Sequence, residues 1–144
     1  MTRPNFQFLP DVALADIAFA ARADSLSGLF EACADALTSV MVDRRTLRAR
    51  VTKELKMRAD DSDGLLYDFL TQLIALKDVD SLLFRAFIPD VSKDGKSLTC
   101  AMMGEPIDRE RQVLRNDVKA VTMHMFGIKR GSSGSWETTV VLDI

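Results

Sequence analysis

Two aspartates near opposite ends of the chain stand out because each adjoins apolar residues. Asp16 lies inside the apolar run 15–20, and Asp143 follows the apolar run 140–142, one residue before Ile144. Carboxylates are seldom buried without a partner. If their strands are neighbours, Asp16, Asp143 and the α-carboxylate of Ile144 repel one another unless a divalent cation binds, and Ca²⁺, Mg²⁺ and Mn²⁺ prefer such oxygen ligands. The alternatives are a solvent-facing Asp16 and a solvated chain end.

The segment 118–126 adds two more candidates, Lys119 and His124. In a regular strand Lys119 lies on an otherwise apolar side, where it either snorkels to solvent or meets a phosphate as a point charge. His124 is the only histidine and therefore a candidate general base. No Ser, Cys or carboxylate stands at a recognisable motif spacing from it, so a hydrogen-bonded structural role for His124 is favoured.

The composition excludes several common sites. One histidine and two well-separated cysteines, Cys33 and Cys100, cannot form a zinc framework, and both cysteines are expected to be buried and unpaired. The loop 131–134 lacks the lysine of a phosphate-binding loop. A formal net charge of −2 argues against a broad basic surface for DNA or RNA, so RNA is expected to be reached only through a partner.

The elements that must position these residues follow from apolar periodicity. Spacings of three and four predict one helix that begins after Asp24 or Ser25 and ends near 42–43, and a second that begins at 61–63. Alternating patterns predict the strands, and Asp94-Gly95 predicts a hairpin turn. Strands are expected at 15–20, 46–57, 83–89, 97–104, 118–129 and 136–142, with a surface loop or short helix over 108–116. This order predicts a single α+β domain over residues 1–144, with two helices packed on a largely antiparallel sheet or sandwich.

The chain is expected to be cytoplasmic and to have no membrane partner. No run approaches the roughly 20 apolar residues that a membrane span requires, and no leader pattern follows Met1.

Short pieces spread over the whole chain resemble the archease family. The matching pieces are 15–17, 25–26, 29–32, 40–43, 65–70, 104–105, 118–124 and 142–144. The resemblance implies an α+β fold and a non-catalytic activator of the GTP-dependent RNA-splicing ligase, which promotes guanylylation of that ligase's active-site histidine in tRNA splicing and RNA repair. It also implies that Asp16, Asp143 and the Ile144 carboxylate hold a divalent cation, often calcium, and that Lys119 is a further functional residue.

One departure from the family concerns the residues before Asp16. Many members carry His-Thr where this chain has Ala13-Leu14, so a histidine contribution is lost there, and Asp11 either compensates for it or does not.

The residues themselves leave two other functions open. One is a small metal-dependent hydrolase or phosphotransferase that uses Asp16 and Asp143 with His124 as the base. The other is a structural subunit that binds a partner through the charged segment 108–115.

Overall fold

The computed structural model describes residues 4–10 and 16–144, which form eight strands, two long helices and one short 3-10 turn. In chain order the elements are β1 (Asn5–Leu9), β2 (Asp16–Ala23), α1 (Leu26–Met41), η1 (Arg44–Thr46), β3 (Val51–Arg58), α2 (Ser62–Asp80), β4 (Leu82–Val91), β5 (Ser97–Pro106), β6 (Ala120–Val121), β7 (Ile128–Arg130) and β8 (Trp136–Asp143). Ala13, Leu14 and Asp11, at which the sequence departs from the archease pattern, lie outside the described residues.

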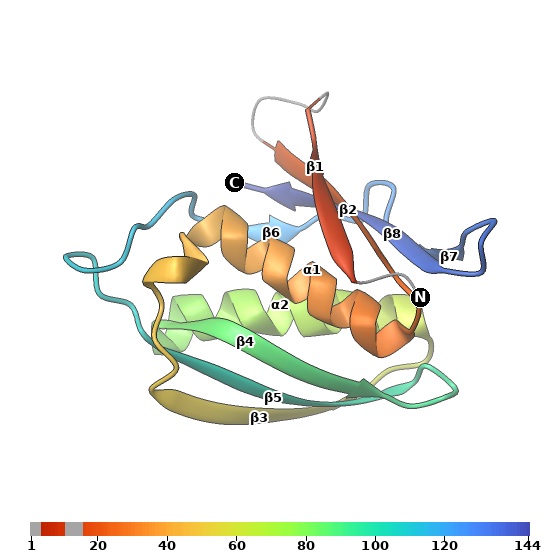
Figure 1. The fold of residues 1–144 in the computed structure, drawn as a ribbon, viewed down its shortest axis with the longest axis horizontal. Coiled ribbons are helices and arrows are strands. Elements are labelled where there is room, and N and C mark those ends of the chain that lie inside the picture. The colour runs from red at the N-terminus through yellow and green to blue at the C-terminus, as the bar shows by residue number, and fades with distance from the viewer. Residues whose placement is uncertain (1–3, 11–15) are drawn as a thin grey trace.

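The strands form two separate antiparallel sheets. The larger sheet has the order β1-β2-β8-β6, with β7 also paired to β8, and the smaller one has the order β3-β5-β4. Both helices lie between the two sheets, so that each sheet buries one face against them (Figure 1). The predicted α+β class with two helices and antiparallel strands is confirmed. Periodicity shows which face of a strand is buried and not which strands pair, so the division into two sheets comes from the structure.

The helices begin where the sequence predicts. The Ser25 hydroxyl accepts a hydrogen bond from the Gly28 N–H and caps α1, and the Asp61 carboxylate does the same for the Gly64 N–H at the start of α2. Neither helix is long and apolar enough to cross a membrane, as far as the described residues go.

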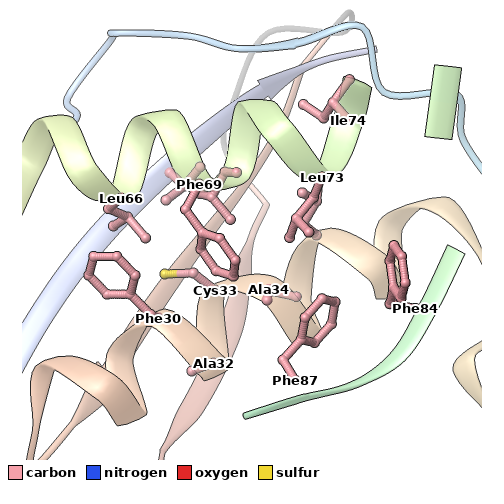
Figure 2. Close-up of a cluster of buried hydrophobic side chains, with 14 of the residues drawn as sticks. Phe30, Ala32, Cys33, Ala34, Leu66, Phe69, Leu73, Ile74, Phe84 and Phe87 are labelled. Atoms are coloured by element: carbon pink, nitrogen blue, oxygen red, sulfur yellow. The ribbon is translucent and has the colours of Figure 1, made fainter. Parts of the chain in front are cut away.

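Aromatic rings fill the space between the helices and the smaller sheet. The rings of Phe30 and Phe69 stack with their centroids 5.8 Å apart, and Phe87 of β4 meets Phe69 edge to face at 6.5 Å (Figure 2). Cys33 lies fully buried beside them, and both it and Cys100 are free thiols, as predicted. This core fixes the helices against both sheets and so holds the sheet that carries the candidate carboxylates.

Two predicted strands have different bounds. The strand expected over 46–57 starts only at Val51, because the chain first makes the turn η1 and buries Leu47. The strand expected over 118–129 is two short strands, β6 and β7, joined by a turn in which Met125 adopts a φ of 58°. That left-handed conformation interrupts the alternation that a single strand needs.

A bulge in β4 depends on a glycine in β5. The register pairs Phe84 with Gly104 and Ala86 with Met103, which leaves Arg85 as the extra residue. A Cβ atom on Gly104 would lie 2.0 Å from the Leu83 carbonyl oxygen, so only glycine allows the backbone of the bulge to approach this closely.

We expect Gly104→Ala to lower the free energy of unfolding by about 3 kcal/mol or more, because the new methyl group would clash with backbone atoms that cannot move independently. Gly127→Ala is the matched control, since a methyl group added there would have as its nearest neighbour an Asp63 carboxylate oxygen, 3.7 Å away. It should change the unfolding free energy by about 0.5 kcal/mol or less in urea titrations. Equal effects of the two substitutions would contradict this account of the bulge.

Candidate functional site

The structure places the two candidate carboxylates opposite each other on neighbouring strands. β2 and β8 are antiparallel, and their register pairs Asp16 with Asp143. Directly opposed residues have Cβ atoms about 4.5–5.5 Å apart and project to the same face of the sheet. The two side chains therefore share one corner, where β2 begins and β8 ends, and we call this place the carboxylate corner.

The carboxylate corner borders an apolar patch and is open to solvent. Along the same face the next pair is Ala18 and Val141, both buried, whereas Asp16 and Asp143 are each partly exposed. Within residues 4–10 and 16–144, no side chain donates a hydrogen bond to either carboxylate or forms an ion pair with it. Two neighbouring negative charges without a protein cation favour a bound cation or a basic partner.

Lys119 lies at the same corner through its backbone. The Lys119 N–H donates to the Asp143 carbonyl at 2.8 Å, and the next residue, Ala120, pairs with Asp143 in the β6–β8 ladder. The Thr122 N–H extends the attachment to the Val141 carbonyl at 2.9 Å. The Lys119 side chain is exposed.

The segment that delivers Lys119 is held by a buried lysine of α2. Lys77 is only 8% exposed, and its ammonium donates to the Val118 carbonyl at 2.7 Å and to the Asp117 carboxylate at 2.5 Å. It also contacts the Asp78 carboxylate at 2.7 Å. Burial by itself would lower the pKa of Lys77, but the hydrogen bonds to Asp117 and Asp78 outweigh burial and leave that pKa raised. Lys77 therefore stays charged and keeps residues 117–118 against the helix.

A second buried ion pair fixes the chain that leads to this segment. Glu105 is 2% exposed, pairs with the Arg111 guanidinium and accepts the Arg48 N–H at 2.8 Å. The hydrogen bond from Arg111 outweighs burial and lowers the pKa of Glu105 to about 2. The stretch 108–116, predicted as a surface loop or short helix, is thus a loop that is tied to the core.

The donor chemistry of the carboxylate corner fits a hard divalent cation. Its protein ligands would be carboxylate oxygens, which Ca²⁺, Mg²⁺ and Mn²⁺ prefer. Nowhere in the described part of the chain do three His, Cys, Asp or Glu side chains gather as a metal site. At this corner Asp16 and Asp143 would supply two side-chain ligands, and the adjacent Ile144 carboxylate would be the candidate for a third.

The structure corrects the expectations for His124 and for the side of Lys119. His124 lies exposed in the turn after β6, and no described residue hydrogen bonds to its imidazole, so the expected hydrogen-bonded structural role is wrong. Met123 and Met125, expected to form an apolar side with Lys119, are 67% and 60% exposed. Both errors follow from treating this turn as a continuous strand.

Sequence reasoning missed Lys77 and Glu105. Lys77 falls on the apolar face of α2, three residues after Ile74 and four after Leu73. A cation on that face can be recognised in the sequence, and it could have pointed to Lys77. Glu105 offered a weaker signal, a single acidic residue at the end of an apolar strand. Neither partner, Asp117 or Arg111, can be identified from spacing alone.

Comparison with known proteins finds relatives in the Archease protein family. The sequence pattern of the Archease protein family matches residues 6–144. Protein archease of Pyrococcus abyssi is 34% identical over 132 residues, which cover 90% of this chain and 93% of that protein. Protein archease of Methanothermobacter thermautotrophicus is 35% identical over 142 residues, covering 97% and 99% respectively.

Two solved structures have the same fold. The solution structure of Methanobacterium thermoautotrophicum protein 1598 superposes with a TM-score of 0.78 at 33% identity, covering 96% of this chain and 98% of that one. A crystal structure from Thermotoga maritima, described as an archease and possible chaperone, has a TM-score of 0.62 at 18% identity and covers 94% and 96%. At that lower identity the likeness shows the fold alone.

We expect Lys77→Met to loosen the segment that carries Lys119 while the fold persists, because the Val118 carbonyl loses its buried donor. The free energy of unfolding should fall by about 2 kcal/mol. Native-state hydrogen exchange should accelerate at the Lys119 and Thr122 amides, which bond to β8. Lys93→Met, at an exposed turn position, is the control and should leave both amides unchanged. Unaltered exchange in Lys77→Met would show that Lys77 does not position this segment.

Proposed function

This chain belongs to the archease family, and from that premise we propose that it activates a GTP-dependent RNA-splicing ligase by docking on it, with no reaction of its own. In this proposal the protein promotes guanylylation of the active-site histidine of the ligase and its repeated turnover. The protein partner is the ligase, RNA is met only through it, and the protein works in the cytoplasm.

The observation that carries the proposal is the pairing of Asp16 with Asp143 beside Lys119. The two aspartates lie on a partly exposed corner of the larger sheet and the Lys119 side chain is exposed, so a partner can reach all three. A catalytic nucleophile and its base must lie within hydrogen-bond distance of each other. Among the residues described, no Ser, Cys or His hydrogen bonds to the side chain of Asp16 or Asp143. An accessible charged corner without such a pair supports a role in positioning another protein's groups.

A divalent cation, Ca²⁺ in the first instance and Mg²⁺ or Mn²⁺ as alternatives, would be held by Asp16, Asp143 and the Ile144 carboxylate. When bound, it supplies positive charge that can attract phosphate or carboxylate oxygens. The chain's own contribution is to hold the two aspartates opposite each other and to keep Lys119 next to them. Lys119 then acts as a separate point charge toward a phosphate or carboxylate of the ligase site.

Asp16→Asn and Lys119→Ala should each fold normally and lower ligase guanylylation by about tenfold or more, because each removes a charge that the partner site meets. The assay follows incorporation of radiolabelled GTP into the ligase from the same organism. Asp90→Asn and Lys93→Ala change the same residue types at exposed positions outside the corner and should activate fully. Full activation by both corner variants would contradict the proposed site, and phosphoester turnover by the isolated protein that depends on His124 would contradict the absence of a reaction.

Calcium binding tests the carboxylate corner without the ligase. In calorimetric titrations of the isolated protein, Asp143→Asn should weaken Ca²⁺ binding by about tenfold or more, since one of the anionic ligands is lost. A short Gly-Ser extension after Ile144 should also weaken binding, because it moves the α-carboxylate away from Asp143. Asp90→Asn should bind as the parent protein does. Unchanged binding in the extended protein would remove Ile144 from the ligand set.

A further inference from the structure

A hollow of about 440 Å³ at the C-terminal end of α1 is lined by four arginines. Arg44 and Arg45 come from η1, Arg85 from the bulge of β4, and Arg115 from the loop between β5 and β6. Ser39 and Asp43 complete the lining. We call it the arginine hollow. It is separate from the carboxylate corner, and nothing in the proposed activation uses it.

Two of the four guanidinium groups are neutralised by the protein. Arg45 binds Asp43 through two parallel hydrogen bonds of 3.1 and 2.8 Å, and Arg44 forms an ion pair with Asp35 at 3.0 Å. These carboxylates hold two of the arginines in fixed positions at the rim.

The other two guanidinium groups carry charge in excess. Arg115 donates to the Ser39 carbonyl at 3.0 Å and forms only a long ion pair, at 3.8 Å, with the Asp43 carboxylate, which Arg45 already binds. No acceptor within the described parts of the chain pairs with the Arg85 side chain, which is exposed. About two positive charges therefore face a hollow in a protein whose net charge is −2.

The fold places Arg85 there by a specific irregularity. Arg85 is the extra residue of the β4 bulge, and the bulge requires the close approach of Gly104. Bulges re-aim side chains and occur often beside functional sites. In a regular strand Arg85 itself would pair with Met103. Because of the bulge, Ala86 takes that place and Arg85 has no partner residue in β5.

We propose that the arginine hollow binds a phosphate group, with Arg85 and Arg115 donating to its oxygens. A carboxylate presents two oxygens in one plane and suits a single guanidinium fork, as Asp43 already does with Arg45. A phosphate presents up to three terminal oxygens in a tetrahedral arrangement and carries up to two charges, so it can accept from guanidinium groups that arrive from different elements. The phosphate belongs either to a free nucleotide or to a polynucleotide backbone, and the second source would replace the proposal that RNA is met only through the ligase.

The test uses the full chain with three probes: inorganic phosphate, a nucleoside monophosphate and a short fluorescent single-stranded oligonucleotide. Amide and Arg side-chain NMR shifts follow the first two, and fluorescence anisotropy follows the third. We expect saturable binding that Arg85→Ala weakens by about tenfold or more, as loss of a charge-assisted hydrogen bond does. Arg58→Ala removes the same charge at the exposed end of β3 and should leave binding unchanged.

Arg85→Ala is the primary variant because the described structure gives that side chain no partner whose loss would unfold the protein. Arg85→Lys keeps the charge and loses the planar fork, so we expect intermediate binding. Arg115→Ala should weaken binding similarly, with thermal unfolding as the check on its contact with Ser39.

The probes also separate the two sources of phosphate. Binding of the small probes with no gain for the oligonucleotide supports a nucleotide ligand. Much tighter binding of the oligonucleotide supports a backbone ligand. In that case the slope of the logarithm of the binding constant against the logarithm of the salt concentration should become shallower by about 0.7 for each arginine removed. An equal loss in Arg58→Ala, no saturable binding of any probe, or binding of an acidic peptide in preference to all three would overturn the proposal.

Discussion

The buried ammonium of Lys77 connects the helix layer to the part of the larger sheet that carries the candidate site. β6 has only two residues, too few to hold the preceding loop in place by strand pairing alone. The three oxygen partners of Lys77 replace the lost hydration of the charge and fix residues 117–118 beside α2. From there the chain leads directly to Lys119 and its hydrogen bond with Asp143. The position of Lys119 thus depends on a second lysine that is itself buried.

The two functional features are linked by one short stretch of chain. Arg115 lines the arginine hollow, and its N–H bonds to the Met41 carbonyl at the end of α1, whereas Lys119 bonds to Asp143 at the carboxylate corner. Four residues can span at most about 14 Å, so a positive hollow and a negative corner lie near each other. A net charge close to zero conceals this separation of charge. It explains why the overall composition argues against phosphate binding while one local surface favours it.

Apolar periodicity predicted both helices well, and so did the cap residue Ser25 for α1, because a cap acts within one turn of the residue it satisfies. The Asp94-Gly95 turn predicted the β4–β5 hairpin for the same reason, and Gly95 has the expected positive φ of 73°. The failures involve contacts that are distant in sequence. The turn at Met125 follows an alternating pattern that happens to match a strand, and the division into two sheets depends on pairing. Asp16, Asp143 and Lys119 could be singled out by type, but the pairing of Lys77 with Asp117 and the convergence of the arginines required the fold.

The register of β2 with β8 has a consequence for how the protein is made. Asp16 is synthesised well before Asp143, and β8 is the strand that joins β2 to β6. The larger sheet therefore cannot form in full, and the two carboxylates cannot meet, until β8 has been synthesised. A chain that stops before β8 would contain the sequence of α1, α2 and the smaller sheet but would have no carboxylate corner. It would therefore lack the Asp16–Asp143 pair on which the proposed activation depends.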